Sequence, residues 1–461
     1  MLNKLQISEK ATIREALSAI EMNHHGMIFL RDGDGGIAGL VTDGDIRRHL
    51  LGGVGLDQPV AGCANTDFVW ADSSSSREML LKRLDSQISF IPLLNEHRHL
   101  VSVISRDSLP SDDESRIYAR SRSPVRISFS GGGSDLTHYF TNETGAVINT
   151  TVSLYSHAVL RLRDDDRVII HSRDLNDTLE AENVTDAVAA EGQFGLIQAL
   201  INTVRPDYGF ELYLYSDYPM NSGLGGSAVV SSAVLGCFNQ FRQDRWDQHE
   251  LAELAFQAER LSLNISGGWQ DQYATVFGGF NFMEFRMDQN IVHPLRIAPD
   301  ILLELEESLI LCDTGIGHQS GEIHLDQKQQ MQQGEVRQFV QANVELAYTM
   351  RNQLLRGRLL DFGNSLHKAW ELKRRVSERI SSSHLDGIYS LALASGALGG
   401  KLLGAGGGGF FLFYVTPFEK HRLMEALEGG GLAIRPFRFE HEGLQAWTVR
   451  ESNNHKDGIR P

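Results

Sequence analysis

The chain has 461 residues, 41% of them hydrophobic, and a formal net charge of −16 at pH 7. This length exceeds one ordinary hydrophobic core, so two or three globular domains are expected. The strong negative charge argues against nucleic acid or an anionic membrane surface as the main partner.

The cysteines and the N-terminus bear on the compartment. Cys63, Cys237 and Cys312 are widely separated, so neither a metal-binding spacing nor a disulfide framework is expected. The first residues carry charges where a secretory leader needs an apolar run, and no apolar stretch reaches the length of a membrane span. These features predict a soluble, cytoplasmic protein.

Residues 1–110 contain an internal repeat of about 60 residues, in the order helix, strand, turn, strand, helix. In the first copy, apolar spacing predicts a helix over 13–20 and strands over 25–30 and 37–42, followed by a helix from residue 43. In the second copy, the same order is predicted for 76–84, 89–94 and 100–105. The polar residues 111–121 are predicted to be a linker.

The run Gly39-Leu-Val-Thr-Asp-Gly-Asp-Ile46 resembles the strand-to-helix corner of cystathionine-β-synthase (CBS) modules. The resemblance implies a tandem CBS pair in which Thr42 and Asp45 hold the phosphate and ribose of a regulatory adenosine nucleotide. The alternative is that these two residues only cap a helix. The second copy has Ser105 and Ser108 at the matching places, so at most one nucleotide site is expected. CBS pairs commonly dimerise, so a homodimer is expected.

A glycine-rich loop at 219–228 lies between a predicted strand, 210–215, and a predicted buried helix, 229–241. Glycines let a backbone curl around a phosphate, and a helix N-terminus directs N–H groups and a positive dipole end toward it. The Walker pattern needs Lys and then Ser or Thr after its last glycine, but Ser227-Ala228 follows here. We therefore expect a phosphate loop of a different kind.

A second motif begins with an extended run, 125–129, that contains Arg126. A strand interior rarely holds an arginine without a partner, so a phosphate or carboxylate is expected beside it. An edge-strand arginine facing water is the alternative. Three glycines and then Ser134-Asp135 follow the strand.

These two stretches and Lys401-Leu-Leu-Gly-Ala-Gly-Gly-Gly-Gly-Phe-Phe-Leu412 together resemble the three motifs of the GHMP kinases, in the same order. The resemblance implies an α+β fold with a ribosomal-protein-like N-terminal ATP-binding domain at 122–320 and an α/β C-terminal domain at 321–452. A polar tail, 453–461, is expected to fray. The chain departs from the usual Gly-Leu-x-Ser-Ser-Ala core because Gly226 replaces the first serine.

The resemblance also implies roles for individual residues. Asp271 is expected to be the base that takes the proton from the sugar hydroxyl, and Arg126 to keep it ionised and neutralise the transferred phosphate. Mg²⁺ is expected on Ser227 and on Glu259, which interrupts the apolar face of a helix at 247–263. The residues expected to bind ATP are Pro219, Ser222, Gly223, Leu224, Gly225, Gly226, Ser227 and Ala228. Those expected to bind the sugar are Gly132, Gly133, Asp135, Lys373, Gly406 and Gly407.

Three longer stretches resemble the D-glycero-D-manno-heptose 7-phosphate kinase branch: 123–136, 267–285 and 401–411. That branch makes a sugar 1,7-bisphosphate for nucleotide-activated heptose synthesis. Lys373, in the basic run 366–375, would then meet the phosphate of the substrate. Two alternatives stay open: a kinase for a non-phosphorylated sugar such as fucose, and a nucleotide-sensing CBS protein with an inactive kinase scaffold.

Overall fold

The structure is a computed structural model, which describes residues 2–73, 75, 77–84, 88–105, 116–317, 320–331 and 334–451. The chain divides into two compact units. The N-terminal unit comprises residues 1–115 with 452–461, and the C-terminal unit comprises residues 116–451. Within the described residues, no helix combines the length and apolarity needed to cross a bilayer.

The N-terminal unit contains two copies of one topology. The first copy consists of β1 (Gln6–Ser8), α1 (Ile13–Asn23), β2 (Met27–Arg31), β3 (Ile37–Thr42) and α2 (Asp43–Leu51). The second consists of β4 (Ala71–Asp72), α3 (Arg77–Arg83), β5 (Phe90–Leu94) and β6 (Leu100–Ser105). In each copy the first two strands pair in parallel and the last two antiparallel. The predicted repeat is therefore confirmed for its helix and two strands, while the final helix of the second copy falls outside the described residues.

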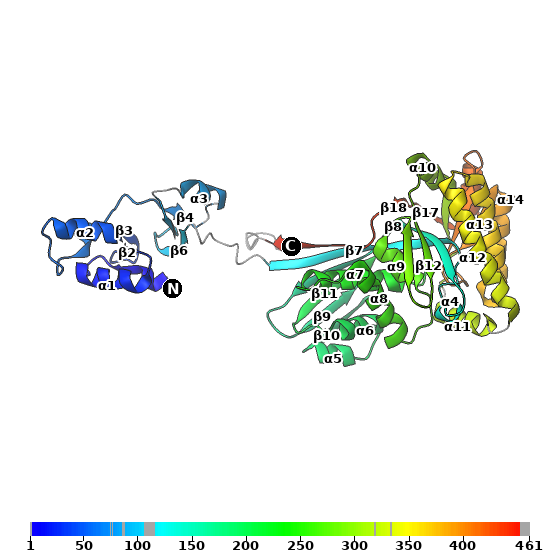
Figure 1. The fold of residues 1–461 in the computed structure, drawn as a ribbon, viewed down its shortest axis with the longest axis horizontal. Helices are drawn as coiled ribbons and strands as arrows, with labels where there is room; N and C mark the ends of the chain where they lie inside the picture. Colours follow the sequence, from blue (N-terminus) through cyan, green and yellow to red (C-terminus); the bar gives the residue numbers. More distant parts are fainter. Residues whose placement is uncertain are drawn as a thin grey trace. The chain divides into compact units, whose positions relative to one another are not determined.

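The C-terminal unit is built on a nine-stranded sheet (Figure 1). Its strands are β7 (Arg116–Ser130), β8 (Gly145–Leu162), β9 (Val168–Ser172), β10 (Asp177–Ala181), β11 (Phe210–Ser216), β12 (Asn281–Phe285), β13 (Asn290–Pro294), β18 (Phe439–Glu440) and β19 (Gln445–Glu451). The main path runs β10-β9-β11-β8-β12-β13, while β7 pairs with β8 and β19.

Two predictions about this sheet are wrong. Residues 116–121 were predicted to be linker, but they form the start of β7, because β19 pairs with them from 445 to 451. The three aspartates at 164–166 are typical of a hairpin turn, which predicts direct pairing of the strands on either side of them. Instead β11 lies between β8 and β9, antiparallel to the first and parallel to the second.

Helices cover one face of this sheet. They are α5 (Val184–Ala189), α6 (Gly195–Val204), α7 (Gly226–Gln240), α8 (Gln248–Phe256) and α9 (Gln270–Phe277), with the short α4 (Thr137–Phe140) near β7. The central helix, α7, packs on β7 and β8 (Figure 1). It is almost wholly buried, as its apolar run predicts, and this burial holds its N-terminus and the preceding loop in place.

A second, four-stranded sheet has the order β15-β16-β14-β17. Its strands are β14 (Leu309–Asp313), β15 (Ala397–Leu402), β16 (Phe410–Val415) and β17 (Ala433–Arg435). The helices of this part are α10 (Pro299–Ser308), α11 (Ser320–Met331), α12 (Gly334–Leu355), α13 (Leu359–Arg374), α14 (Ser383–Ala394) and α15 (Lys420–Gly429).

The two sheets exchange strands across the expected boundary at residue 320. β14 precedes that boundary but belongs to the four-stranded sheet, and β18 and β19 follow it but belong to the nine-stranded sheet. One continuous hydrophobic core serves both sheets. The third glycine-rich motif connects the antiparallel strands β15 and β16.

Candidate active site

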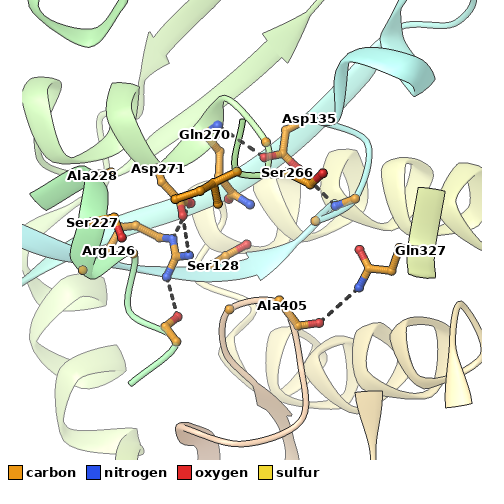
Figure 2. A pocket seen from close by; sticks show the side chains of 18 of the residues that line it. Arg126, Ser128, Asp135, Ser227, Ala228, Ser266, Gln270, Asp271, Gln327 and Ala405 are labelled. Atoms are coloured by element: carbon orange, nitrogen blue, oxygen red, sulfur yellow. Dashed lines mark hydrogen bonds and ion pairs between the residues drawn. The ribbon is translucent and has the colours of Figure 1, made fainter. Parts of the chain in front are cut away.

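A cavity of about 530 Å³ lies where the three glycine-rich motifs meet. Side chains from β7, α9, α13 and β15 line it together with the loops that precede α7 and follow β15 (Figure 2). The predicted site residues in its wall are Arg126, Gly132, Gly133, Asp135, Ser222, Gly223, Gly225, Gly226, Ser227, Ala228, Glu259, Asp271 and Lys373.

An ion pair between Arg126 and Asp271 lies at the centre of the cavity wall. Arg126 Nε and Nη2 donate to the two carboxylate oxygens of Asp271 at 2.8 and 3.0 Å, and Nη1 donates to the carbonyl of Gly223 at 2.8 Å. The Arg126 side chain is only 5% exposed, whereas that of Asp271 is 19% exposed. The expected partner of the strand arginine is therefore a carboxylate that remains accessible from the cavity (Figure 2).

The glycine-rich loop passes directly over this pair. Gly225 caps α7 with φ +81°, and a Cβ there would lie 3.4 Å from both the Arg126 guanidinium carbon and the Asp271 carboxyl carbon. A Cβ at Gly404 would lie 2.6 Å from the Cα of Gly223. The third motif can therefore pack this closely against the second only because Gly404 has no side chain. The hydroxyl of Ser222 is buried in the cavity wall and has no hydrogen-bond partner among the described residues.

Glu259 belongs to a π-helical turn, η3 (Gln257–Ser262), that continues α8. Such a turn shifts the side chains that follow it and often accompanies a functional site. Burial raises the pKa of Glu259, while the neighbouring Arg260 guanidinium and a hydrogen bond from Ser227 act in the opposite direction. Gln272 Nε2 also donates to the carboxylate at 2.8 Å. Ser227 and Glu259 are thus side by side at the start of α7.

Asp135 lies at the other end of the cavity wall and is 3% exposed. The backbone N–H groups of Gly133 and Gln270 donate to its carboxylate at 3.1 and 3.3 Å. Burial raises the pKa of Asp135, and the negative charge of Asp271 raises it further. The side-chain oxygen of Gln270 is buried nearby without a hydrogen-bond partner among the described residues.

Two buried lysines also line the cavity. Lys373 Nζ donates to the carbonyls of Leu402 and Gly404 at 2.8 and 2.6 Å, and Lys401 Nζ donates to the carbonyl of Ser128 at 2.7 Å. Burial lowers the pKa of both lysines. Lys401 was not among the residues predicted from the sequence, although a lysine inside a buried strand is a signal that could have identified it.

A smaller cavity, about 180 Å³, adjoins the first along the glycine-rich loop. Asn221, Gly226 and Ser227 line both cavities, whereas apolar side chains such as Leu175, Ile197 and Val230 line the smaller one alone. The loop therefore separates a polar, charged compartment from a largely apolar one.

Comparisons with known proteins agree with this geometry. Sequence models of the GHMP kinases N terminal domain and the GHMP kinases C terminal domain match residues 194–279 and 350–429, respectively. A D-glycero-alpha-D-manno-heptose 7-phosphate kinase of Campylobacter jejuni is 36% identical over 336 residues, 72% of this chain and 99% of that protein. This chain belongs to the GHMP kinase family.

Further comparisons describe the relatives and the extra unit of this GHMP kinase. The solved structure of a D-glycero-D-manno-heptose 1-phosphate kinase from Bacteroides thetaiotaomicron is 29% identical, with a TM-score of 0.60 over 72% of this chain and 99% of that one. The L-fucokinase/L-fucose-1-P guanylyltransferase of Bacteroides fragilis is 26% identical over 63% of this chain and 34% of that protein. A CBS domain model matches residues 3–52, the first copy in the N-terminal unit.

The residues present fit a magnesium ion beside a nucleotide triphosphate. Mg²⁺ prefers oxygen ligands and usually takes only one or two carboxylates, with phosphates and water completing its shell. The Glu259 carboxylate and the Ser227 hydroxyl offer two oxygen ligands of this kind. The Ser222 hydroxyl, which has no hydrogen-bond partner among the described residues, lies in the same wall. When bound, the ion would neutralise charge on the triphosphate.

Four of the predicted ATP- or sugar-binding residues do not line the larger cavity. Leu224 is buried in the hydrophobic core, and Pro219 is exposed outside the cavity wall. Gly406 and Gly407 pack against Ile380 of η4 (Glu378–Ile380): a Cβ at Gly406 would lie 2.8 Å from the Cα of Ile380, and the N–H of Gly407 donates to its carbonyl. From this motif, Gly404 and Ala405 line the cavity instead.

In the N-terminal unit, Thr42 and Asp45 form a capping box at the start of α2. Asp45 Oδ2 accepts hydrogen bonds from the backbone N–H and hydroxyl of Thr42 at 2.9 and 2.6 Å, and Arg48 pairs with the other oxygen. A nucleotide at this corner would compete with these bonds. Ser108 of the second copy, the linker residues 111–115 and the tail 453–461 lie outside the described residues.

Replacing Gly268 with alanine is expected to displace Asp135 and weaken sugar binding. An added Cβ would lie 1.7 Å from Asp135 Oδ2, so the carboxylate must move. We expect KM for the sugar to rise by about tenfold or more while KM for ATP changes little, because one strong hydrogen-bonded contact is worth about 1.5 kcal/mol or more. Steady-state kinetics with each substrate varied in turn measures this. Gly387→Ala, with open space around the added carbon, is the matched control.

Proposed function

We propose that this GHMP kinase transfers the γ-phosphoryl group of ATP to the anomeric hydroxyl of D-glycero-D-manno-heptose 7-phosphate. The product would be the 1,7-bisphosphate. One structural observation supports this substrate. The cavity wall contains two buried lysines, Lys373 and Lys401, whose hydrogen bonds among the described residues are to neutral carbonyls. Buried cations of this kind favour an anionic ligand.

The arrangement supplies each part that phosphoryl transfer needs. The nucleoside would occupy the apolar cavity of about 180 Å³, and the phosphates would cross the loop at Gly226 and Ser227 into the larger cavity. Backbone N–H groups at the N-terminus of α7 would bind the phosphates. Asp271 would accept the proton of the acceptor hydroxyl, and Arg126 would hold its carboxylate in position while offsetting charge on the transferred group.

The sugar would lie between Asp271 and Asp135, which both face the larger cavity (Figure 2). Asp135 is held by two backbone N–H groups and would accept hydrogen bonds from sugar hydroxyls. Lys373 was expected to bind the substrate phosphate. Burial and the positive charges of Lys401 and Arg126 lower the pKa of Lys373, so we propose that the substrate phosphate stabilises its ammonium form.

Two roles are proposed for the N-terminal unit. Its CBS domain would bind an adenosine nucleotide at the α2 corner, with Thr42 and Asp45 exchanging their capping bonds for bonds to the ligand. It would also mediate homodimer formation. Isothermal titration of AMP, ADP and ATP against the full chain tests the first role; a Thr42→Ala variant that binds equally well would contradict this assignment.

The substrate is tested by ADP release with Mg²⁺-ATP against D-glycero-D-manno-heptose 7-phosphate and the matching non-phosphorylated sugars, including fucose. We expect kcat/KM for the heptose phosphate to exceed the others by about 10²-fold or more, because the substrate phosphate would stabilise the charged form of Lys373, which a neutral sugar cannot do. A preference for fucose would instead support a free-sugar kinase and remove the reason for a substrate-phosphate site. Absence of turnover with every sugar would favour the inactive-scaffold alternative.

A further inference from the structure

Lys401 occupies an unusual position in the active-site cavity. It lies on β15, is 2% exposed, and its ammonium group reaches across to the carbonyl of Ser128 on β7. Long charged side chains are almost never fully buried without a partner of opposite charge. The ion pairs found among the described residues do not include this lysine, so its burial needs another explanation.

The two arginines in the cavity wall are already paired with carboxylates. Arg126 is paired with Asp271 at 2.8 Å, and Arg260 is paired with Glu259 at 3.2 Å. The groups that act electrostatically on Lys401 are Arg126 on β7 and Asp135 on the loop after it, and Lys373 on α13 is coupled to it as well. Lys401 is therefore within electrostatic reach of both Arg126 and the carboxylate proposed to hold the sugar.

The donors of Lys401 are incompletely used. An ammonium group has three N–H donors, and among the described residues Lys401 makes one hydrogen bond, to Ser128. The hydroxyl of Ser128 is buried in the same wall and has no hydrogen-bond partner among the described residues. Two side chains at adjoining positions thus present unused hydrogen-bonding capacity to the cavity.

We propose that Lys401 contacts the substrate. Its ammonium group binds the part of the sugar that lies between the acceptor hydroxyl and the hydroxyls bound by Asp135. It also places a positive charge beside the transferred phosphoryl group. Ser128 supplies a further hydrogen bond to the same part of the sugar. This role of Lys401 requires only that the protein is a sugar kinase. The proposed substrate enters only through the choice of sugar for the experiment.

The protonation of Lys401 supports this role. Burial lowers the pKa of Lys401 to about 7, with Arg126 lowering it and Asp135 raising it. In the free enzyme the lysine is therefore charged below pH 7 and loses its proton as the pH rises through 7. An incoming anion or a developing negative charge stabilises the ammonium form, so substrate binding above pH 7 is coupled to proton uptake.

The test compares Lys401→Met with the wild type in the full chain, using Mg²⁺-ATP and heptose 7-phosphate. We expect kcat/KM for the sugar to fall by about 10²-fold in the variant. In the wild type, kcat/KM should decrease as the pH rises from 7 to 9, approaching tenfold per pH unit, and the variant should lack this decrease. Titration calorimetry at pH 8 in buffers of different ionisation enthalpy should show proton uptake in the wild type alone.

Two controls separate this role from a structural one. Lys420→Met removes a lysine on α15 that pairs with Glu307 outside the cavity, and should leave the kinetics unchanged. Replacing a buried charge with an apolar side chain of similar length should leave the melting temperature of Lys401→Met equal or raised. If Lys401 only joins β15 to β7, the melting temperature falls and the wild-type pH profile persists, which would overturn the proposal.

The choice of sugar does not confound the result. If the wild type acts on another sugar of the panel, the same comparison is made with that sugar, so the substrate proposal fails while the role of Lys401 is still tested. If no sugar of the panel is turned over, the calorimetric experiment uses Mg²⁺-ATP with heptose 7-phosphate. Absence of proton uptake in that mixture would count against Lys401 as a ligand-binding residue.

Discussion

Asp271→Asn is expected to lower kcat by about 10²–10⁴-fold, the range found when a general base is removed. Asparagine has nearly the same shape and can still accept a hydrogen bond from Arg126, so the wall of the cavity should be preserved. It cannot accept the proton of the acceptor hydroxyl. KM for ATP and for the sugar should therefore stay within a few-fold of the wild-type values. Initial-rate measurements of ADP release with both substrates varied test this.

Asp300→Asn is the matched control, because this exposed aspartate lies in the first turn of α10, outside the cavity wall. It makes the same chemical change without removing a proposed base, so its kcat should equal that of the wild type. If Asp271→Asn keeps more than a tenth of the wild-type kcat, Asp271 only positions other groups, and the enzyme works without a carboxylate base.

Arg126→Met is expected to affect both stability and catalysis. It leaves the Asp271 carboxylate, 19% exposed, without its bidentate partner, and losing one member of such a pair costs about 3 kcal/mol. It also removes the positive charge that we propose lies beside the transferred phosphoryl group, so kcat/KM should fall by about 10²–10³-fold.

Urea unfolding and steady-state kinetics separate the loss of stability from the loss of activity when Arg161→Met is measured alongside. Arg161 pairs with the buried Glu211, on β8 and β11 of the same sheet, outside the active-site cavity. This control should lose stability but retain kcat/KM. A parallel loss of activity in both variants would show that the effect of Arg126→Met comes from unfolding, and the catalytic role of Arg126 would then be wrong.

Local pattern predicted most elements of this kinase well. The alternation at 210–215 and the apolar run at 229–241 became β11 and α7, with the glycine-rich loop between them, because each element buries the face that its periodicity marks. The strand arginine was expected to need a partner, and Asp271 provides it from 145 residues further along the chain. The position of Arg126 in a strand predicted that its partner is negatively charged, but not which residue provides that charge.

What the sequence could not predict depends on contacts between distant segments. The start of β7 reads as polar linker, since its strand conformation comes from pairing with β19 at the far end of the unit. The insertion of β11 between β8 and β9 is likewise a matter of topology. Lys401 lies in a glycine-rich motif, and the sequence does not show which groups surround it. Ser128, Arg126 and Asp135, which interact with it, come from a segment more than 260 residues earlier in the chain.

The pairing of β7 with β19 has a consequence for how this protein is assembled from modules. Arg116 is paired with Glu451, so the first and last residues of the C-terminal unit are neighbours on adjacent strands. A unit whose ends meet in this way tolerates appended or inserted domains, because new chain enters and leaves at one point of its surface. The N-terminal unit therefore joins the C-terminal unit at a point where added chain is well tolerated. A short peptide joining residues 451 and 116 would permit circular permutation of the C-terminal unit at other surface loops.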